Sequence, residues 1–161
     1  MAKTEEARTL DPKFKYEVAG RPGGENIKSC FACGVCTAGC PVAEVEEAFN
    51  PRRIIRQVLL GLRDEVLSSD EIWYCITCFD CTYHCPQNVK FANVMGVLRD
   101  MAVEEGYVAP SFPGRVEETG RLVQEMRRDM VRFLLAGKTE EAPLDPAQLA
   151  RAVKNLASGG E

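Results

Sequence analysis

Apolar residues recur at helical spacing along most of this chain of 161 residues. In the clearest case Asn50 is a candidate N-cap, Pro51 takes the first helical position and Gly61 lies just past the end. The apolar face of this helix carries Ile54, Ile55, Val58 and Leu59. The same periodicity predicts helices over residues 89–105 and 115–136. The pattern therefore predicts that the long elements of the chain are helices.

Shorter patterns predict the remaining elements. The alternation from Phe14 to Val18 predicts an edge strand or an extended arm. Ser68 and Glu71 match a capping box, which predicts a helical start just before the second group of cysteines. A last short helix is predicted over residues 145–156.

Breaks in the pattern divide the chain into three predicted regions. These are an amino-terminal arm over 1–23, a compact domain over 24–108, and a helical extension with a frayed end over 109–161. The extension carries an apolar stripe of Val116, Val123, Met126, Met130, Phe133 and Leu134. The stripe is either part of this chain's own core or rests on another protein of a complex, and the sequence leaves both readings open.

All eight cysteines lie in two copies of the pattern C-x2-C-x2-C-x3-C-P. The first copy is Cys30, Cys33, Cys36 and Cys40, followed by Pro41, and the second is Cys75, Cys78, Cys81 and Cys85, followed by Pro86. Three thiolates at this spacing can each bind a different iron of one 4Fe-4S cube, while the fourth lies beyond their reach. In two-cluster ferredoxins with this spacing, the fourth thiolate binds the other cluster.

The spacing therefore predicts two 4Fe-4S clusters with crossed ligands. The first cluster is assigned to Cys30, Cys33, Cys36 and Cys85, and the second to Cys75, Cys78, Cys81 and Cys40. Because proline suits the first position of a helix, a helix is predicted to follow each motif.

Two other uses of the cysteines fit less well. Four disulfides would need very short, strained loops, and no secretion signal precedes the motifs. Structural zinc favours paired C-x2-C knuckles. A zinc site would not need the third cysteine or the C-P step of each copy. The only histidine, His84, is expected at the surface, and Trp73 and Tyr74 are expected to pack near a cluster.

Charge and composition exclude several classes of function. The formal net charge is −4, and two clusters on eight thiolates bring the total to about −8, so nucleic acid is an unfavourable partner. No apolar run approaches the roughly 18 to 20 residues that span a bilayer. Reduced thiols and the lack of a signal peptide indicate the cytoplasm. Because every thiol serves as a ligand, no catalytic residue is expected in the chain itself.

The phrases CFACGVCTAGCP, NPRRIIRQVLLGL and IWYCITCFDCTYHCP make residues 24–108 resemble the C subunit of heterodisulfide reductase (HdrC). The arginine-bearing helix that closes on Gly61 and the tryptophan two residues before Cys75 favour this family within the wider α-helical ferredoxins. The resemblance implies an all-α fold, namely an α-helical ferredoxin domain with two 4Fe-4S clusters. It also implies two partners, an HdrA-like protein with flavin and iron–sulfur clusters and an HdrB-like, cysteine-rich catalytic protein that acts on a disulfide.

Three rival functions stay open. The chain could be the iron–sulfur subunit of a quinone-linked, membrane-associated dehydrogenase. Against this, no cysteine occurs in the 29 residues before Cys30, where the succinate type has a 2Fe-2S domain, or in the 76 after Cys85, where the glycerol-3-phosphate type has its repeats. A free-standing ferredoxin and a zinc-stapled interaction module are the other two.

Overall fold

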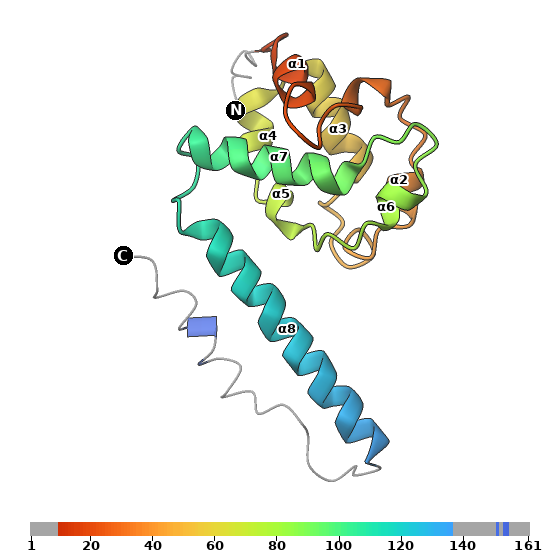
Figure 1. The fold of residues 1–161 in the computed structure, drawn as a ribbon, viewed down its shortest axis with the longest axis vertical. Coiled ribbons are helices and arrows are strands. Elements are labelled where there is room, and N and C mark those ends of the chain that lie inside the picture. Colours follow the sequence, from red (N-terminus) through yellow and green to blue (C-terminus); the bar gives the residue numbers. More distant parts are fainter. Residues whose placement is uncertain (1–9, 137–150, 152, 155–161) are drawn as a thin grey trace, which may run out of the picture. The chain divides into compact units, whose positions relative to one another are not determined.

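The computed structural model describes residues 10–136, 151, 153 and 154, and every regular element within them is helical (Figure 1). The helices are α1 Phe14–Ala19, η1 Ile27–Ser29, α2 Val35–Ala38, α3 Pro51–Leu60, α4 Arg63–Leu67, α5 Glu71–Tyr74, α6 Asp80–Tyr83, α7 Phe91–Glu104 and α8 Phe112–Leu135. The predicted all-α fold is confirmed. None of the described helices has the length and apolar character needed to cross a membrane.

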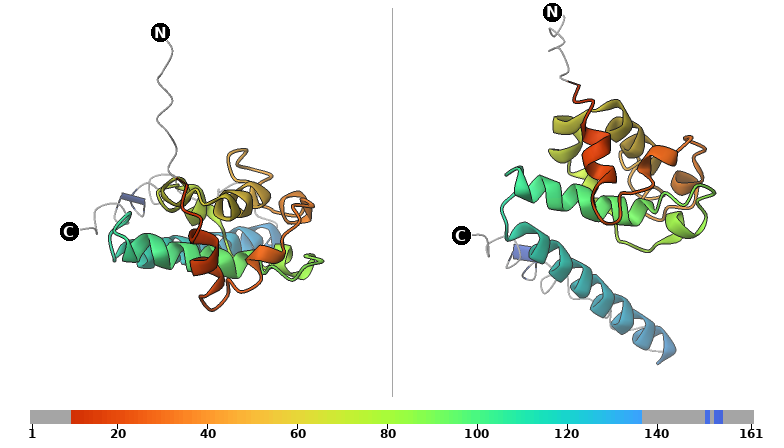
Figure 2. Two further views of the ribbon diagram at one scale, coloured as in Figure 1. Left: turned by 90° about the horizontal axis from the view of Figure 1, so that it is seen from above. Right: turned by 45° about the horizontal axis from the view of Figure 1, so that its top comes forward.

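The chain divides into two compact units, residues 1–108 and 109–161. The first unit is built around α7, which contacts α1, α4, α5 and α6 (Figures 1 and 2). Its largest fully buried side chains are Phe14, Phe49, Ile27, Ile54, Leu67, Ile72, Met95, Leu98 and Met101. The apolar core therefore lies among these helices.

Helix α3 forms as its end signals predict. The side chain of Asn50 accepts a hydrogen bond from the backbone N–H of Arg53 at 3.0 Å. At the other end Gly61 adopts φ +84°, and its carbonyl accepts the backbone N–H of Asp11 at 2.7 Å. A Cβ at Gly61 would lie 2.3 Å from the carbonyl oxygen of Asp11, so this close approach requires glycine.

The prediction of a strand or extended arm from Phe14 to Val18 is wrong, because these residues form helix α1. Phe14 and Val18 are both fully buried, whereas Tyr16 between them is 58% exposed. Residues four apart share one face of a helix, so the same short alternation satisfies a helix that contacts α3 and α7.

The capping box predicted at Ser68 and Glu71 does not form, because Asp70 is the N-cap of α5 and its side chain makes no capping hydrogen bond. Ser68 ends helix α4, which the sequence pattern did not predict, and the hydroxyl of Ser69 accepts the backbone N–H of Glu71 at 3.1 Å.

Helix α7 confirms the helix predicted over 89–105, and α8 confirms the one over 115–136. Helix α8 begins at Phe112, within the predicted break, because Pro113 is compatible with a first helical turn. None of the residues of α8 is buried. The short helix predicted over 145–156 lies largely outside the described residues.

Candidate metal centres

The two cysteine motifs follow the same backbone course, 45 positions apart. Ala32 and Thr77 occupy equivalent positions with φ of +59° and +51°. Two residues on, Gly34 and Phe79 have φ of +89° and +63°, and each is followed by a one-turn helix, α2 or α6. Left-handed conformations at residues other than glycine are strained and cluster at functional sites. The duplication thus extends from the cysteine spacing to the loop conformation.

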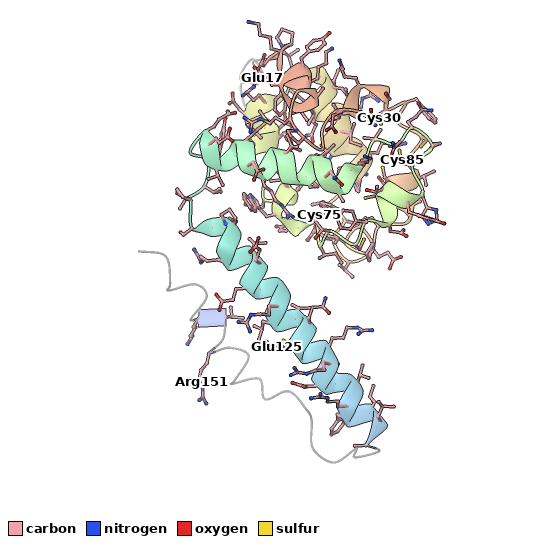
Figure 3. All side chains as sticks on the ribbon, in the orientation of Figure 1. Glu17, Cys30, Cys75, Cys85, Glu125 and Arg151 are labelled. Carbon is pink, nitrogen blue, oxygen red and sulfur yellow. The ribbon has the colours of Figure 1, made fainter. Side chains whose placement is uncertain are left out.

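The first hollow in this unit combines cysteines from both motifs. Its cysteines are Cys30, Cys33, Cys36, Cys81 and Cys85. Figure 3 shows Cys30 and Cys85 near one another at the end of the unit that carries α2 and α6. The fourth cysteine of the second motif therefore lies beside the first three of the first motif.

The second hollow has the reciprocal composition. Its cysteines are Cys40, Cys75, Cys78 and Cys81. Cys81 and Phe91 line both hollows, so the two are neighbours, and Phe91 begins helix α7. Apart from these cysteines, the second hollow is lined by the apolar side chains of Val42, Ile76, Phe79, Phe91 and Ala92.

The side chains between the cysteines lie largely at the surface. Phe31 is 60% exposed, Ile76 is 63% exposed and Tyr83 is 87% exposed. His84 is also exposed, as predicted, and lies 3.5 Å from the carboxylate of Asp80. The cluster loops thus present an apolar surface around the hollows, while the core lies behind them.

One buried hydroxyl tests whether the second hollow fits a sulfur-rich group. The Oγ1 of Thr82 is buried and has no hydrogen-bond partner within the described part of the chain. Its counterpart Thr37 donates to the Asn50 side chain and accepts the backbone N–H of Arg52, both at 3.1 Å. A buried hydroxyl without a partner is costly. Because Thr82 adjoins Cys81, a thiolate or sulfide acceptor would satisfy it, and the residues fit a 4Fe-4S cluster.

The thiols of both loops are free of disulfide bonds. All eight cysteines are free, and no three potential ligands among the described residues converge where a single metal ion could bind. Each thiolate of a cube binds a different iron, so such thiolates lie apart. Burial raises the pKa of the Cys36 and Cys75 thiols and raises the pKa of Cys81 to about 11. Metal binding must therefore displace protons from these thiols.

The helices predicted directly after Pro41 and Pro86 do not form. Both prolines begin turns, and regular helices start only at Pro51 and Phe91. Asn88 and Lys90 adopt left-handed conformations before α7, with φ of +50° and +56°. The chain must curve around each hollow before it can enter a helix, and this long-range requirement overrides the local preference of proline.

Comparison with known proteins agrees with the site. Residues 26–89 match the 4Fe-4S dicluster domain family. The prediction of two 4Fe-4S clusters is therefore confirmed. Among the described elements, η1 to α6 and the turns between them lie within the matched stretch.

Curated relatives carry the name that the motifs indicate. The chain is 44% identical over 92 residues to the iron–sulfur C2 subunit of CoB–CoM heterodisulfide reductase from Methanocaldococcus jannaschii, a match of 57% of this chain and 48% of that protein. It is 41% identical over 110 residues to the C2 subunit of the H2/formate:CoB–CoM heterodisulfide, ferredoxin reductase from Methanococcus maripaludis, covering 64% and 59%. It is 35% identical over 102 residues to the C subunit of the H2:CoB–CoM heterodisulfide, ferredoxin reductase from Methanothermobacter marburgensis, covering 63% and 54%.

The resemblance to the C subunit of heterodisulfide reductase is thereby confirmed. The chain spans about half the length of the curated relatives it matches. These relatives are named as subunits of reductases, and the matched 4Fe-4S dicluster domain marks this chain as an iron–sulfur protein.

Two residues of the site escaped the sequence reasoning. Thr82 repeats the Cys-Thr step of Thr37, and this repetition was a signal that could have found it. Arg99 donates to the backbone carbonyl of Cys75, and no sequence feature places these two residues together.

Proposed function

We propose that this chain relays single electrons through two 4Fe-4S clusters between a flavin-containing partner and a disulfide-active catalytic partner in a heterodisulfide reductase-like complex. The observation that carries the proposal is the similarity of the cluster domain to proteins named as the C subunit of such reductases. The two neighbouring hollows support it, because adjacent clusters allow an electron to pass from one to the other within the chain.

The proposed ligand sets are crossed between the two motifs. Cys30, Cys33, Cys36 and Cys85 would hold the first cluster, and Cys75, Cys78, Cys81 and Cys40 the second. The lining of the hollows supports this assignment, since Cys85 faces the first hollow and Cys40 the second. Crossed ligation would join the segments before and after α3 through inorganic bonds.

The chain's own contribution is to hold and separate the clusters. The bound clusters supply the one-electron chemistry, and the protein supplies thiolates, an apolar surrounding and fixed charges. The cytoplasm remains the predicted location, to be checked by fractionation of the native cells. Substrate turnover is assigned to the catalytic partner, because each thiol of this chain serves as a ligand.

The test is anaerobic purification of the tagged full chain from its native source, followed by identification of the bound proteins. We expect a flavin-containing protein and a cysteine-rich protein in fixed ratio with this chain. A membrane anchor with a quinone-linked flavoprotein, or a monomer without partners, would refute the proposal. Iron and acid-labile sulfide in the same sample, about eight of each per chain for two 4Fe-4S clusters, establish that the domain is loaded.

A further inference from the structure

Arg99 reaches from α7 to the end of α5, directly before the second cysteine loop. Its Nε donates to the carbonyl oxygen of Ile72 at 2.7 Å, and its Nη2 donates to that of Trp73 at 3.3 Å. The same Nη2 donates to the carbonyl oxygen of Cys75 at 2.7 Å. The last carbonyls of a helix have no partner within the helix. Arg99 therefore caps α5 and holds the backbone of Cys75, the proposed cluster ligand that Figure 3 labels.

The charge of Arg99 is not balanced by a carboxylate. No acidic side chain in the described part of the chain forms an ion pair with its guanidinium, which is partly buried and lies 5.7 Å from the ring centre of Trp73. Desolvation lowers the pKa of Arg99, and its interaction with Cys75 opposes that shift. A partly buried charge is expensive unless an opposite charge compensates it.

Arg63 shows the usual arrangement for comparison. It forms ion pairs with Asp11 at 3.0 Å, Glu17 at 2.8 Å and Glu105 at 2.6 Å. Its side chain is 22% exposed, so burial alone does not explain why Arg99 has only carbonyl partners. The opposite charge nearest to Arg99 in the loaded protein would be the second cluster with its thiolates.

We propose that Arg99 is a positioning residue whose fixed positive charge raises the midpoint potential of the second cluster. A 4Fe-4S cluster on four thiolates carries −2 when oxidised and −3 after it gains one electron. A nearby cation stabilises the more negative form more strongly, which favours reduction. The electron comes from a reduced flavin or an equivalent one-electron donor, and the step neither forms nor breaks a bond.

The first cluster has a weaker counterpart in Arg52. This side chain lines the first hollow, but it is exposed to solvent. Water and salt screen exposed charges more than partly buried ones. The carboxylate of Asp80 on α6 lies beside the second loop and would oppose Arg99, but the Asp80 side chain is 44% exposed, so solvent screens its charge. Arg99 should therefore affect the potential of its cluster more than Arg52 affects the other.

The test is a redox titration of the loaded full chain, followed by paramagnetic resonance. The signals are assigned with the variants Cys33→Ser and Cys78→Ser. These two cysteines belong to different clusters whether or not the fourth ligands are exchanged between the motifs. In Arg99→Met, we expect the second cluster to be harder to reduce. The distribution of one electron between the two clusters should shift at least about tenfold away from the second cluster, which corresponds to about 59 mV. Arg99→Lys keeps the positive charge and should shift this electron distribution less. Arg52→Met should change the first cluster by a smaller factor.

Arg63→Met is the matched control, because it removes an arginine that already has carboxylate partners. It should lower stability without a selective change in either potential. An unchanged second-cluster potential in loaded Arg99→Met overturns the proposal. If that variant loses the second cluster, Arg99→Lys decides. A second-cluster potential near that of the native chain supports the charge role, whereas loss of the cluster or a shift of about tenfold overturns it.

The inference rests on the presence of two clusters but not on the partners proposed above. The titration uses the chain without other proteins, so it can succeed even if purification finds a different complex. Failure of the titration, with both clusters present, leaves the proposed complex untouched.

Discussion

The two cysteine loops share a backbone course but differ in how the protein holds them. The first loop is tied to α3, because the hydroxyl of Thr37 bonds to Asn50 and to the backbone of Arg52. In the second loop the equivalent hydroxyl of Thr82 is buried without a partner within the described residues. In the first loop the protein itself thus supplies the hydrogen-bond partners of the threonine hydroxyl. In the second loop the equivalent hydroxyl lacks a partner that a bound cluster would supply.

The loops also differ in strain and charge. Gly34 takes its left-handed conformation at little cost, whereas the side chain of Phe79 makes the same conformation strained. The arginine beside the first hollow is exposed, and the one behind the second is partly buried. A duplicated motif can therefore place two similar clusters, while residues that differ between the two loops or lie outside the repeat give the clusters different surroundings.

The largest effect is expected from replacing the fourth cysteine of each motif by serine. Cys85→Ser should damage the first cluster and Cys40→Ser the second, because each residue lines the hollow of the opposite motif. Paramagnetic resonance and iron content of the two anaerobic variants measure this, with Cys33→Ser as the reference for loss of the first cluster. Loss of the second motif's signal in Cys85→Ser would contradict the crossed assignment.

Removal of both clusters should loosen the second loop more than the first. Helix α2 keeps its hydrogen bonds to the α3 region, whereas the Thr82 hydroxyl of α6 has no such bond. Amide hydrogen exchange before and after anaerobic chelation measures the difference. The core helix α7 is the internal reference, and equal loss of protection in α2 and α6 would remove the distinction between the loops.

Replacing the paired threonines should have unequal effects on the stability of the cluster-free chain. Thr37→Val removes hydrogen bonds to Asn50 and Arg52 and should cost about 1–2 kcal/mol in the free energy of unfolding. Thr82→Val removes a buried hydroxyl that lacks a partner and should be neutral or stabilising. Denaturant unfolding under anaerobic, reducing conditions measures both. Equal destabilisation by the two variants would show that Thr82 is also bonded.

The smallest effect is expected from the conformation of Gly34. Gly34→Ala should cost about 1 kcal/mol, because its φ is +89° although the nearest atom, Nη1 of Arg52, leaves room for a methyl group at 3.6 Å. Gly96→Ala is the matched control, since Gly96 lies inside α7 with open space around it and should gain about 0.5–1 kcal/mol. The same unfolding experiment measures both, and a neutral Gly34→Ala would mean that the loop relaxes.

The sequence by itself determined the long helices and the cofactor. The periodicity and end signals of α3, α7 and α8 act over one or two turns, so they can be read without a fold. The cysteine spacing is equally local, because three ligands on one short loop suffice to indicate a cluster. These features explain why the long helices and the two clusters were predicted correctly.

Only the tertiary structure decided how the pieces meet. The alternation at Phe14 and Val18 was compatible with two conformations, and packing against α3 and α7 selected the helix. Turns replaced the helices expected after Pro41 and Pro86 because the chain curves around the hollows. Arg99 reaches the carbonyl of a residue 24 positions earlier. Such contacts depend on how whole helices pack against one another, which no local pattern specifies.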